Sequence, residues 1–473
     1  MKKMIFAICL VALLAAAPAT AQTDFTMYVS LGDSLTAGYA SGSLMDWYQE
    51  RSYPAMISRQ VAGTTFEQPL VSQPGIEPIL ELVHLVPVPV IAPASFTPGL
   101  PLNAAFPRHY NNLGVPGATL ADMIFTTGDI NNLLQGNFDN VMHDLVLRDG
   151  TTTALEQAMA LRPTFVTMWT GNYDVLGAVA SGTPIDGVTM TPVNIFAQLY
   201  NNAVGALATN TSADIVLINL PYQTSTPFVK SVAPYVDIPQ LGRWYLMADT
   251  GVLTDNDLVT LFAGPLIAQG YGLPNGPPLP DNLDLFTGQP GVVLREAEVE
   301  IINDRIDTLN GIIAGAADQF GTLLFDANEL FDEIASGENL PTFGGVTLDT
   351  TFLLGGIFSY DGIHPQNIGY ALVANELIKF INAEFGPRIN VDGSDGPTIP
   401  EVDMGEVLFE GDWQNPGISP AKAREVVLSE EGIQQLYQLF LPKLDQAPRI
   451  RRPGTEREDR PSSESRRKPT VRN

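Results

Sequence analysis

The sequence predicts an α/β fold in which helices cover both faces of a parallel β-sheet. Between about residues 26 and 385, short apolar runs typical of buried strands alternate with longer segments of helical periodicity. Apolar residues make up 45% of the 473-residue chain, which suffices for a large core and excludes wholesale disorder. Ligands of such sheets bind beyond the carboxyl ends of the strands, so chemistry is expected in the residues that follow each strand.

Four strands and four helices are expected in this alternating region. The predicted strands are short apolar segments at residues 26–31, 164–169, 214–220 and 322–325. The predicted helices span residues 153–161, 193–208, 296–320 and 366–385. The third helix has apolar residues at helical spacing from Val299 to Ile313, and the last ends before Gly386-Pro387, a common helix stop.

Two long stretches interrupt the alternation. Residues 74–107 contain eight prolines among many apolar residues, a density that forbids a helix and disfavours a central strand. Residues 222–290 are rich in aromatic side chains. Long insertions are often lids or binding walls. Two alternatives therefore stay open, an apolar groove beside the site or ordinary surface decoration.

The α/β domain is placed at residues 22–388, and both ends of the chain are expected to lie outside it. Residues 1–21 have the positive start, apolar run and small-x-small ending of a signal peptide, and they contain the only cysteine, Cys9. The apolar run is too short to span a bilayer. We therefore expect a secreted or periplasmic bacterial protein that lacks disulfides. Residues 389–446 are predicted to be a linker with short helices, and residues 447–473 a disordered basic tail.

The charge of the chain limits the kinds of partner that it can bind. The net charge is −27, although the tail carries nine Arg and Lys residues against four acidic ones. An acidic body repels phosphate backbones, so nucleic acid is a poor partner. The composition indicates a soluble acidic surface, and a salt-rich habitat would produce a similar one.

Ser34 is the first candidate for chemistry. It lies in the segment Gly32-Asp33-Ser34-Leu35, directly after the first predicted strand. This position places its hydroxyl at the carboxyl edge of the sheet, facing a cleft. The alternative is a helix N-cap, which is the commoner use of a serine after a strand.

A second segment supplies a possible base for that hydroxyl. Asp361 and His364 are three residues apart, close enough to contact each other across one turn, and Pro365 follows. Histidine can accept the proton of a serine near neutral pH, and a neighbouring carboxylate orients the imidazole. Among the other histidines, His109 is a weaker candidate for a residue that reaches the cleft, and His143 is expected to be an ordinary surface or core residue.

These two segments resemble the first and last sequence blocks of the GDSL, or SGNH, hydrolases. Residues 112–119, Asn-Leu-Gly-Val-Pro-Gly-Ala-Thr, resemble the second block and place Gly117 at its oxyanion-hole glycine. The third block departs from the family pattern, Gly-x-Asn-Asp. Here Tyr173 stands where the amide donor is expected, and Asn172 comes one position early. Asn172 is the favoured donor, with the Tyr173 hydroxyl or a missing donor as alternatives.

The resemblance covers about residues 26–385 and implies a three-layer, flavodoxin-like α/β/α sandwich with about five parallel strands, no metal and no cofactor. It implies a serine hydrolase of acyl esters with Ser34, Asp361 and His364 as catalytic residues and Gly117 and Asn172 in the oxyanion hole. A small-molecule or lipid ester is the expected substrate, and the apolar first insertion favours a lipolytic esterase. Carbohydrate acetylesterase, thioesterase and a non-catalytic binding protein on the same scaffold are the alternatives.

Overall fold

A computed structural model describes residues 24–61, 64–84, 88–95, 97–238, 242–343, 345–385, 398–407 and 427–428. The expected signal peptide at 1–21, the tail at 447–473 and most of the segment 389–446 lie outside these ranges. Within that last segment, Val427 and Leu428 form a short strand, β18, where we expected helix. They pair in parallel with Glu81 and Leu82, so a contact distant in sequence decides their conformation.

The centre of the molecule is a sheet of five parallel strands, as predicted. Its order is β15-β8-β7-β1-β4. The strands are β1 (Tyr28–Gly32), β4 (Asn112–Gly114), β7 (Phe165–Trp169), β8 (Asp214–Ile218) and β15 (Leu323–Phe325). Because all five run in the same direction, the residues after their carboxyl ends gather along one edge.

Alternating side chains of the strands build a core on each face of the sheet. Val29 and Leu31 of β1 belong to one cluster of buried apolar residues, whereas Tyr28 belongs to the other. In β7, Val166 and Met168 face the first cluster, and Phe165 and Trp169 the second. Both of these central strands thus bury both faces, which explains their continuous apolar runs in the sequence.

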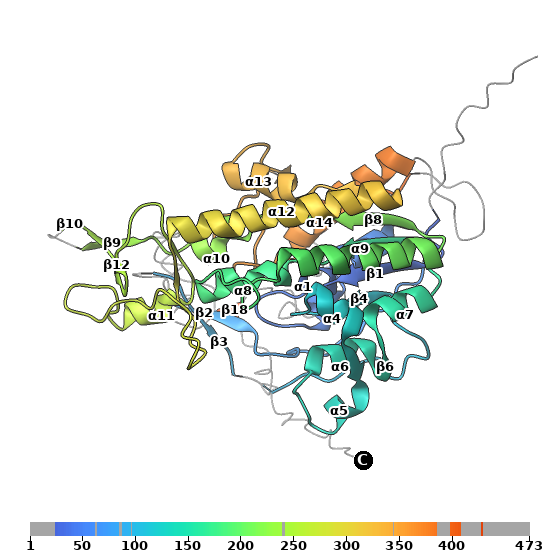
Figure 1. Ribbon diagram of the computed structural model, residues 1–473, viewed down its shortest axis with the longest axis horizontal. Helices are drawn as coiled ribbons and strands as arrows, with labels where there is room; N and C mark the ends of the chain where they lie inside the picture. The colour runs from blue at the N-terminus through green and yellow to red at the C-terminus, as the bar shows by residue number, and fades with distance from the viewer. Residues whose placement is uncertain are drawn as a thin grey trace, which may run out of the picture.

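Helices cover both faces and complete the three-layer sandwich (Figure 1). One layer contains α4 (Leu120–Phe125), α6 (Val141–Leu147), α7 (Ala154–Ala160), α8 (Tyr173–Ser181), α9 (Val193–Asn210) and α12 (Glu296–Phe320). The other contains α3 (Tyr53–Gln60), α13 (Ala327–Ser336) and α14 (Asn367–Phe385). The four predicted helices correspond to α7, α9, α12 and α14, with ends within two residues of the prediction.

Short elements connect these layers. They are α1 (Ser34–Ala37), α2 (Asp46–Gln49), α5 (Ile130–Leu134), the strand pair β5 (Thr127–Asp129) and β6 (Asp149–Thr153), and the pair β16 (Thr342–Phe343) and β17 (Val346–Thr347). Among the described residues, none of the helices is both long and apolar enough to cross a membrane.

The described parts of the two insertions carry short elements of secondary structure. The first holds the antiparallel hairpin of β2 (Leu80–His84) and β3 (Val90–Pro93), outside the central sheet, as its prolines require. The second holds η1 (Gln223–Ser225), α10 (Pro227–Lys230), β9 (Tyr235–Ile238), β10 (Gly242–Tyr245), β11 (Met247–Ala248), β12 (Gly251–Val252), β13 (Leu258–Val259) and α11 (Ala263–Ala268). It projects at one end of the molecule, where β3 contacts α11 (Figure 1).

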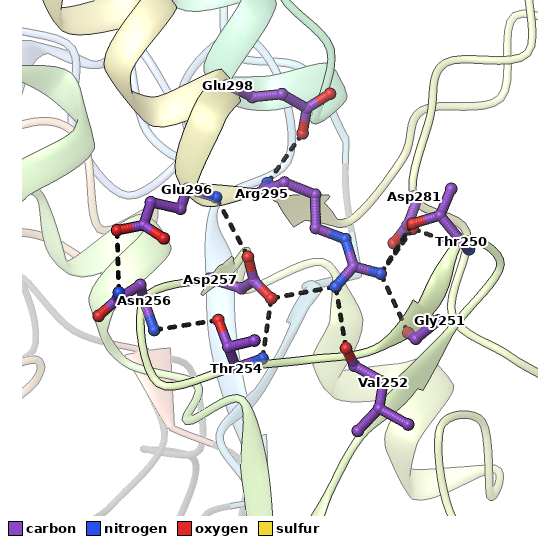
Figure 2. Close-up of polar contacts among 10 residues, drawn as sticks. All are labelled: Thr250, Gly251, Val252, Thr254, Asn256, Asp257, Asp281, Arg295, Glu296 and Glu298. Carbon is purple, nitrogen blue, oxygen red and sulfur yellow. Dashed lines mark hydrogen bonds and ion pairs between the residues drawn. The ribbon is translucent and has the colours of Figure 1, made fainter.

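One arginine fastens the second insertion to the sandwich. Arg295 lies between β14 (Val293–Leu294) and α12 and forms ion pairs with Asp257 at 3.0 Å and Asp281 at 2.9 Å. Its guanidinium also donates to two backbone carbonyls of the insertion, as Figure 2 shows. Strand β14 pairs with β13, so the insertion returns to the body at this point.

Candidate active site

Ser34 lies at the carboxyl edge of the sheet, two residues beyond β1. It is the first residue of α1 and is buried. Asp33 caps this helix, because its side chain accepts a hydrogen bond from Leu35 N at 3.1 Å. A side chain at Gly32 would lie 2.3 Å from the Trp169 carbonyl oxygen, so only glycine fits the strand end from which the Ser34 turn begins.

His364 connects Ser34 to Asp361. Its Nε2 lies 2.8 Å from Ser34 Oγ, and its Nδ1 lies 3.0 Å from Asp361 Oδ2. The imidazole is buried, and the ring of Tyr39 packs 5.0 Å from it, centroid to centroid. The structure therefore brings together the three residues that the sequence named as nucleophile, base and orienting acid, although Ser34 and His364 are 330 positions apart.

The loop that carries the histidine is anchored at its base and at its tip. Phe358 and Pro365 form an antiparallel bridge at the base of the loop. At the tip, Gly42 N donates to Asp361 Oδ2 at 3.2 Å, which joins this loop to the one after α1. Since α14 begins just beyond Pro365, the loop is also fixed to the helical layer.

Asp361 is held in its ionised form. Burial alone would raise its pKa, but the neighbouring His364 and three hydrogen bonds keep the pKa below its usual value. Those bonds come from the His364 ring and from the backbone N–H groups of Ile363 and His364, each N–H at 2.8 Å. A buried carboxylate in this setting stabilises an imidazolium that forms next to it.

Gly117 and Ser34 offer two backbone donors. Gly117 follows β4 and has a φ of +80°, in the region that favours glycine. A Cβ placed there would have only the Tyr173 ring within 4 Å, at 4.0 Å, so the position is open towards that ring. In the ranges that the structure describes, neither the Gly117 N–H nor the Ser34 N–H has a protein acceptor. Both remain available to a ligand.

Asn172 and Tyr173 follow β7 and differ in environment. Asn172 is buried, and its Nδ2 donates to Asp33 Oδ2 at 3.0 Å. Tyr173 begins α8, and 43% of its surface is exposed. Both line the pocket that contains Ser34 and His364. The buried, oriented amide of Asn172 is thus better placed than the Tyr173 hydroxyl to serve as a fixed donor.

Two residues of the site were not assigned from the sequence. Asp33 lies directly before Ser34, and burial raises its pKa to about 6. Gln223 of the second insertion donates from Nε2 to the Asn172 carbonyl oxygen at 2.7 Å. The sequence could have indicated Asp33 as a site residue, because an acidic residue at a helix N-cap directly precedes the serine. For Gln223 there was no such indication, because nothing in its neighbourhood marks the contact with Asn172.

The other histidines lie away from this site. His109 lines a separate surface hollow together with Arg108 and Arg148, so the suggestion that it reaches the cleft is wrong. His143 is half-buried in α6, and burial lowers its pKa. This agrees with its interpretation as an ordinary core or surface residue.

A largely apolar pocket opens beside Ser34. Its walls come from the start of α8, the segment 221–226, α13 and the loop before α14. The apolar lining residues are Leu35, Tyr173, Leu176, Pro221, Tyr222, Phe331, Ala335, Phe358, Ile363 and Pro365. None of the described residues of the first insertion, 74–107, lines this pocket, whereas the second insertion contributes to the wall through its first few residues.

Comparison with known proteins adds two findings. The model of the GDSL-like lipase/acylhydrolase family matches residues 28–377. No curated relative matches the chain.

Among solved structures, an alpha/beta hydrolase enzyme, LAE5, from the metagenome of Lake Arreo, Spain, is 13% identical, with a TM-score of 0.34, over 76% of this chain and 97% of its own. The W215I form of Axe2, an acetyl xylan esterase from Geobacillus stearothermophilus, is 11% identical, with a TM-score of 0.33, over 76% of this chain and 96% of its own. An extracellular lipase from Streptomyces rimosus is 14% identical, with a TM-score of 0.30, over 74% of this chain and 94% of its own. At these scores the likenesses carry no argument about substrate.

The family model, in contrast, spans well over half of the chain, and the protein therefore belongs to the GDSL-like lipase/acylhydrolase family of ester hydrolases.

Proposed function

We propose that the protein hydrolyses carboxylic esters through an acyl-serine intermediate formed on Ser34. The observation that carries the proposal is the unbroken hydrogen-bonded chain from Ser34 Oγ through His364 to Asp361, with distances of 2.8 and 3.0 Å. Because Asp361 accepts a proton-bearing Nδ1, His364 Nε2 is left free to accept the serine proton.

The reaction follows from this geometry in two halves. Ser34 Oγ attacks the ester carbonyl while His364 takes its proton, and the imidazolium then protonates the departing alcohol. His364 next removes a proton from water, which attacks the acyl-serine, and the imidazolium returns a proton to Ser34 Oγ as the bond to the acyl group breaks and the acid leaves. In both halves Asp361 holds the imidazole in one orientation and stabilises its charge.

The oxyanion of each tetrahedral intermediate needs donors that are already in place. We assign this role to the N–H groups of Ser34 and Gly117 and to the side-chain amide of Asn172. The two backbone groups have no acceptor among the residues that the structure describes, and Asn172 is buried in the pocket that contains Ser34. Loss of one such donor lowers turnover by about 10²–10³-fold in other hydrolases.

The pocket supports an apolar acyl group as the preferred substrate part. Its aliphatic and aromatic walls favour hydrocarbon over charged or heavily hydroxylated groups. A lipolytic or aryl esterase is therefore the proposed substrate class. A secreted or periplasmic location in a bacterium is proposed from the signal-like segment 1–21. N-terminal sequencing of exported protein should give Gln22 as its first residue.

The decisive test compares hydrolysis of p-nitrophenyl esters, from acetyl to palmitoyl, by the wild type and by Ser34→Ala. We expect the variant to lose at least about 10³-fold in kcat, since the nucleophile is gone. Ser58→Ala is the matched control, because Ser58 is also buried but lies in α3, outside the pocket.

Each outcome decides between the alternatives. An active wild type whose Ser34→Ala variant is equally active would refute the serine mechanism. An inactive wild type, on every ester length, would favour the non-catalytic binding protein. Activity confined to acetyl esters would move the substrate class from lipolytic to acetyl esters.

A further inference from the structure

Asn172 is held from two sides by residues outside its own helix. Its side-chain Nδ2 donates to Asp33 Oδ2 at 3.0 Å, and its backbone carbonyl accepts from Gln223 Nε2 at 2.7 Å. All three residues are almost fully buried. The bond from Gln223 fixes the backbone at Asn172, and the bond to Asp33 fixes its side-chain amide, although the usual family spacing of this block is altered.

A carboxylate is the group best suited to fix which end of that amide faces it. An ionised carboxylate only accepts hydrogen bonds, so it attracts the NH₂ end and repels the oxygen end of an amide. Asp33 consequently selects the rotamer of Asn172 in which Nδ2 faces Asp33. Of the two protons on Nδ2, one is used by this bond and the other remains for a ligand.

We propose that Asp33 is a positioning residue, which orients the Asn172 amide so that its second N–H faces the oxyanion formed beside Ser34. The inference rests on the proposed ester hydrolysis. Three observations support it. Asp33 is adjacent to Ser34 in sequence, its carboxylate contacts the Asn172 amide, and Asn172 lines the pocket with Ser34 and His364.

The same carboxylate also caps α1, and the two roles can be separated. Oδ1 accepts from Leu35 N at 3.1 Å, whereas Oδ2 accepts from Asn172. Asparagine caps helices as well as aspartate does. An Asp33→Asn variant keeps the side-chain volume, and it keeps the cap through its amide oxygen. Its NH₂ group then occupies the second position, where it can only donate, so it favours the opposite Asn172 rotamer, with Oδ1 facing residue 33.

The test is a double-mutant cycle with Asp33→Asn, Asn172→Ala and the double variant, assayed on the best p-nitrophenyl ester. We expect kcat to fall about 10²–10³-fold in Asn172→Ala and at least about 10-fold in Asp33→Asn, with KM changed less than about 3-fold. The double variant should be no slower than Asn172→Ala, because both changes remove the same donor.

Asp144→Asn is the matched control. Asp144 is also buried and accepts from Asp129 N at 2.7 Å, but it lies in α6, outside the pocket. It should retain wild-type kcat. Thermal unfolding of each variant shows whether any loss of activity comes from misfolding.

Two results would overturn the inference while the proposed function stands. One is an Asp33→Asn variant with wild-type kcat. The other is a double variant whose loss equals the product of the two single losses, since Asp33 and Asn172 would then act independently. A wild type without any esterase activity would instead overturn the proposed function and this inference together.

Discussion

At the scale of single residues, the site contains two carboxylates whose pKa values move in opposite directions, the fully buried Asp33 and the largely buried Asp361. Burial raises the pKa of Asp33 to about 6, because its few hydrogen bonds do not offset the loss of water. Burial acts on Asp361 as well, but there the neighbouring His364 and three hydrogen bonds prevail and lower the pKa. Such divergence between neighbouring acids is typical of functional sites, where different groups serve different roles.

The raised pKa of Asp33 makes a prediction about stability. Between about pH 4 and pH 6, the folded state binds this proton more tightly than the unfolded chain, whose Asp33 has a pKa near 3.8. The free energy of unfolding therefore falls as pH rises through this window. Asparagine does not ionise, so Asp33→Asn avoids this fall in the free energy of unfolding, which is at most roughly 3 kcal/mol. We expect the variant to unfold at a higher Tm than the wild type at pH 8, by a few degrees.

Thermal unfolding at pH 4 and pH 8 checks this expectation. The advantage of Asp33→Asn should shrink or vanish at pH 4, where Asp33 is protonated in the folded protein. His364, Tyr53, Tyr370 and Asp174 also face Asp33, but they are the same in both proteins. A variant that is less stable than the wild type at pH 8 would show that the Asp33 charge stabilises the fold.

The sequence predicted some residues of the site better than others, for a physical reason. The local spacing of Asp361 and His364 already implies their contact, and the resemblance of both segments to family blocks joins this pair to Ser34. The choice between Asn172 and Tyr173 depends on the backbone after β7, which residue order alone does not fix. Gln223 contacts Asn172 from a distant insertion, and its local sequence carries no trace of that contact.

At the scale of elements, the second insertion depends on Arg295. Asp257 and Asp281 are nearly inaccessible, with 5% and 3% of their side chains exposed, and both pair with this one guanidinium (Figure 2). We expect Arg295→Met to destabilise the protein by about 3 kcal/mol, because two buried carboxylates lose their cation. Limited proteolysis should then cut within residues 222–290 faster than in the wild type.

Arg243→Met is the control for this effect. Arg243 lies in the same insertion and pairs with Asp237 at 3.8 Å, but both side chains are well exposed. Exposed pairs contribute little to stability, so this variant should unfold and be cleaved like the wild type. Equal behaviour of the two arginine variants would mean that the buried cluster does not fasten the insertion.

Elements differ in how well the sequence predicted them. The helices α7, α9, α12 and α14 were found with accurate ends, because local signals mark them, such as the apolar periodicity of α12 and the Gly386-Pro387 stop after α14. The short strands of the insertions were not found individually. A two-residue strand such as β13 exists because β14 pairs with it, and that partner is far away in sequence.

At the scale of the whole molecule, the parallel sheet explains why distant segments meet. Ser34 follows β1, Gly117 follows β4 and Asn172 follows β7, and these three strands are neighbours in the sheet. The rule that ligands bind beyond the carboxyl ends of strands was therefore enough to predict the place of the site. It could not predict the pocket walls, because side-chain packing of α13 and residues 221–226 decides them.

The overall charge makes the final prediction, which concerns salt. With a net charge of −27, mutual repulsion among surface carboxylates opposes the compact state. Added salt screens this repulsion, since the Debye length falls from about 10 Å at 0.1 M to about 3 Å at 1 M. We expect the Tm of the full chain at pH 8 to rise by several degrees between 0.05 and 1 M NaCl.

The shape of that salt response separates screening from other effects of salt. Screening acts mainly below about 0.3 M, where the Debye length changes most, so most of the rise should occur there. The buried pairs of Arg295 are shielded from solvent, and Arg295→Met should show the same rise from a lower starting Tm. A Tm that is constant or falls with salt would mean that attractive surface pairs outweigh the repulsion, despite the excess of acidic residues.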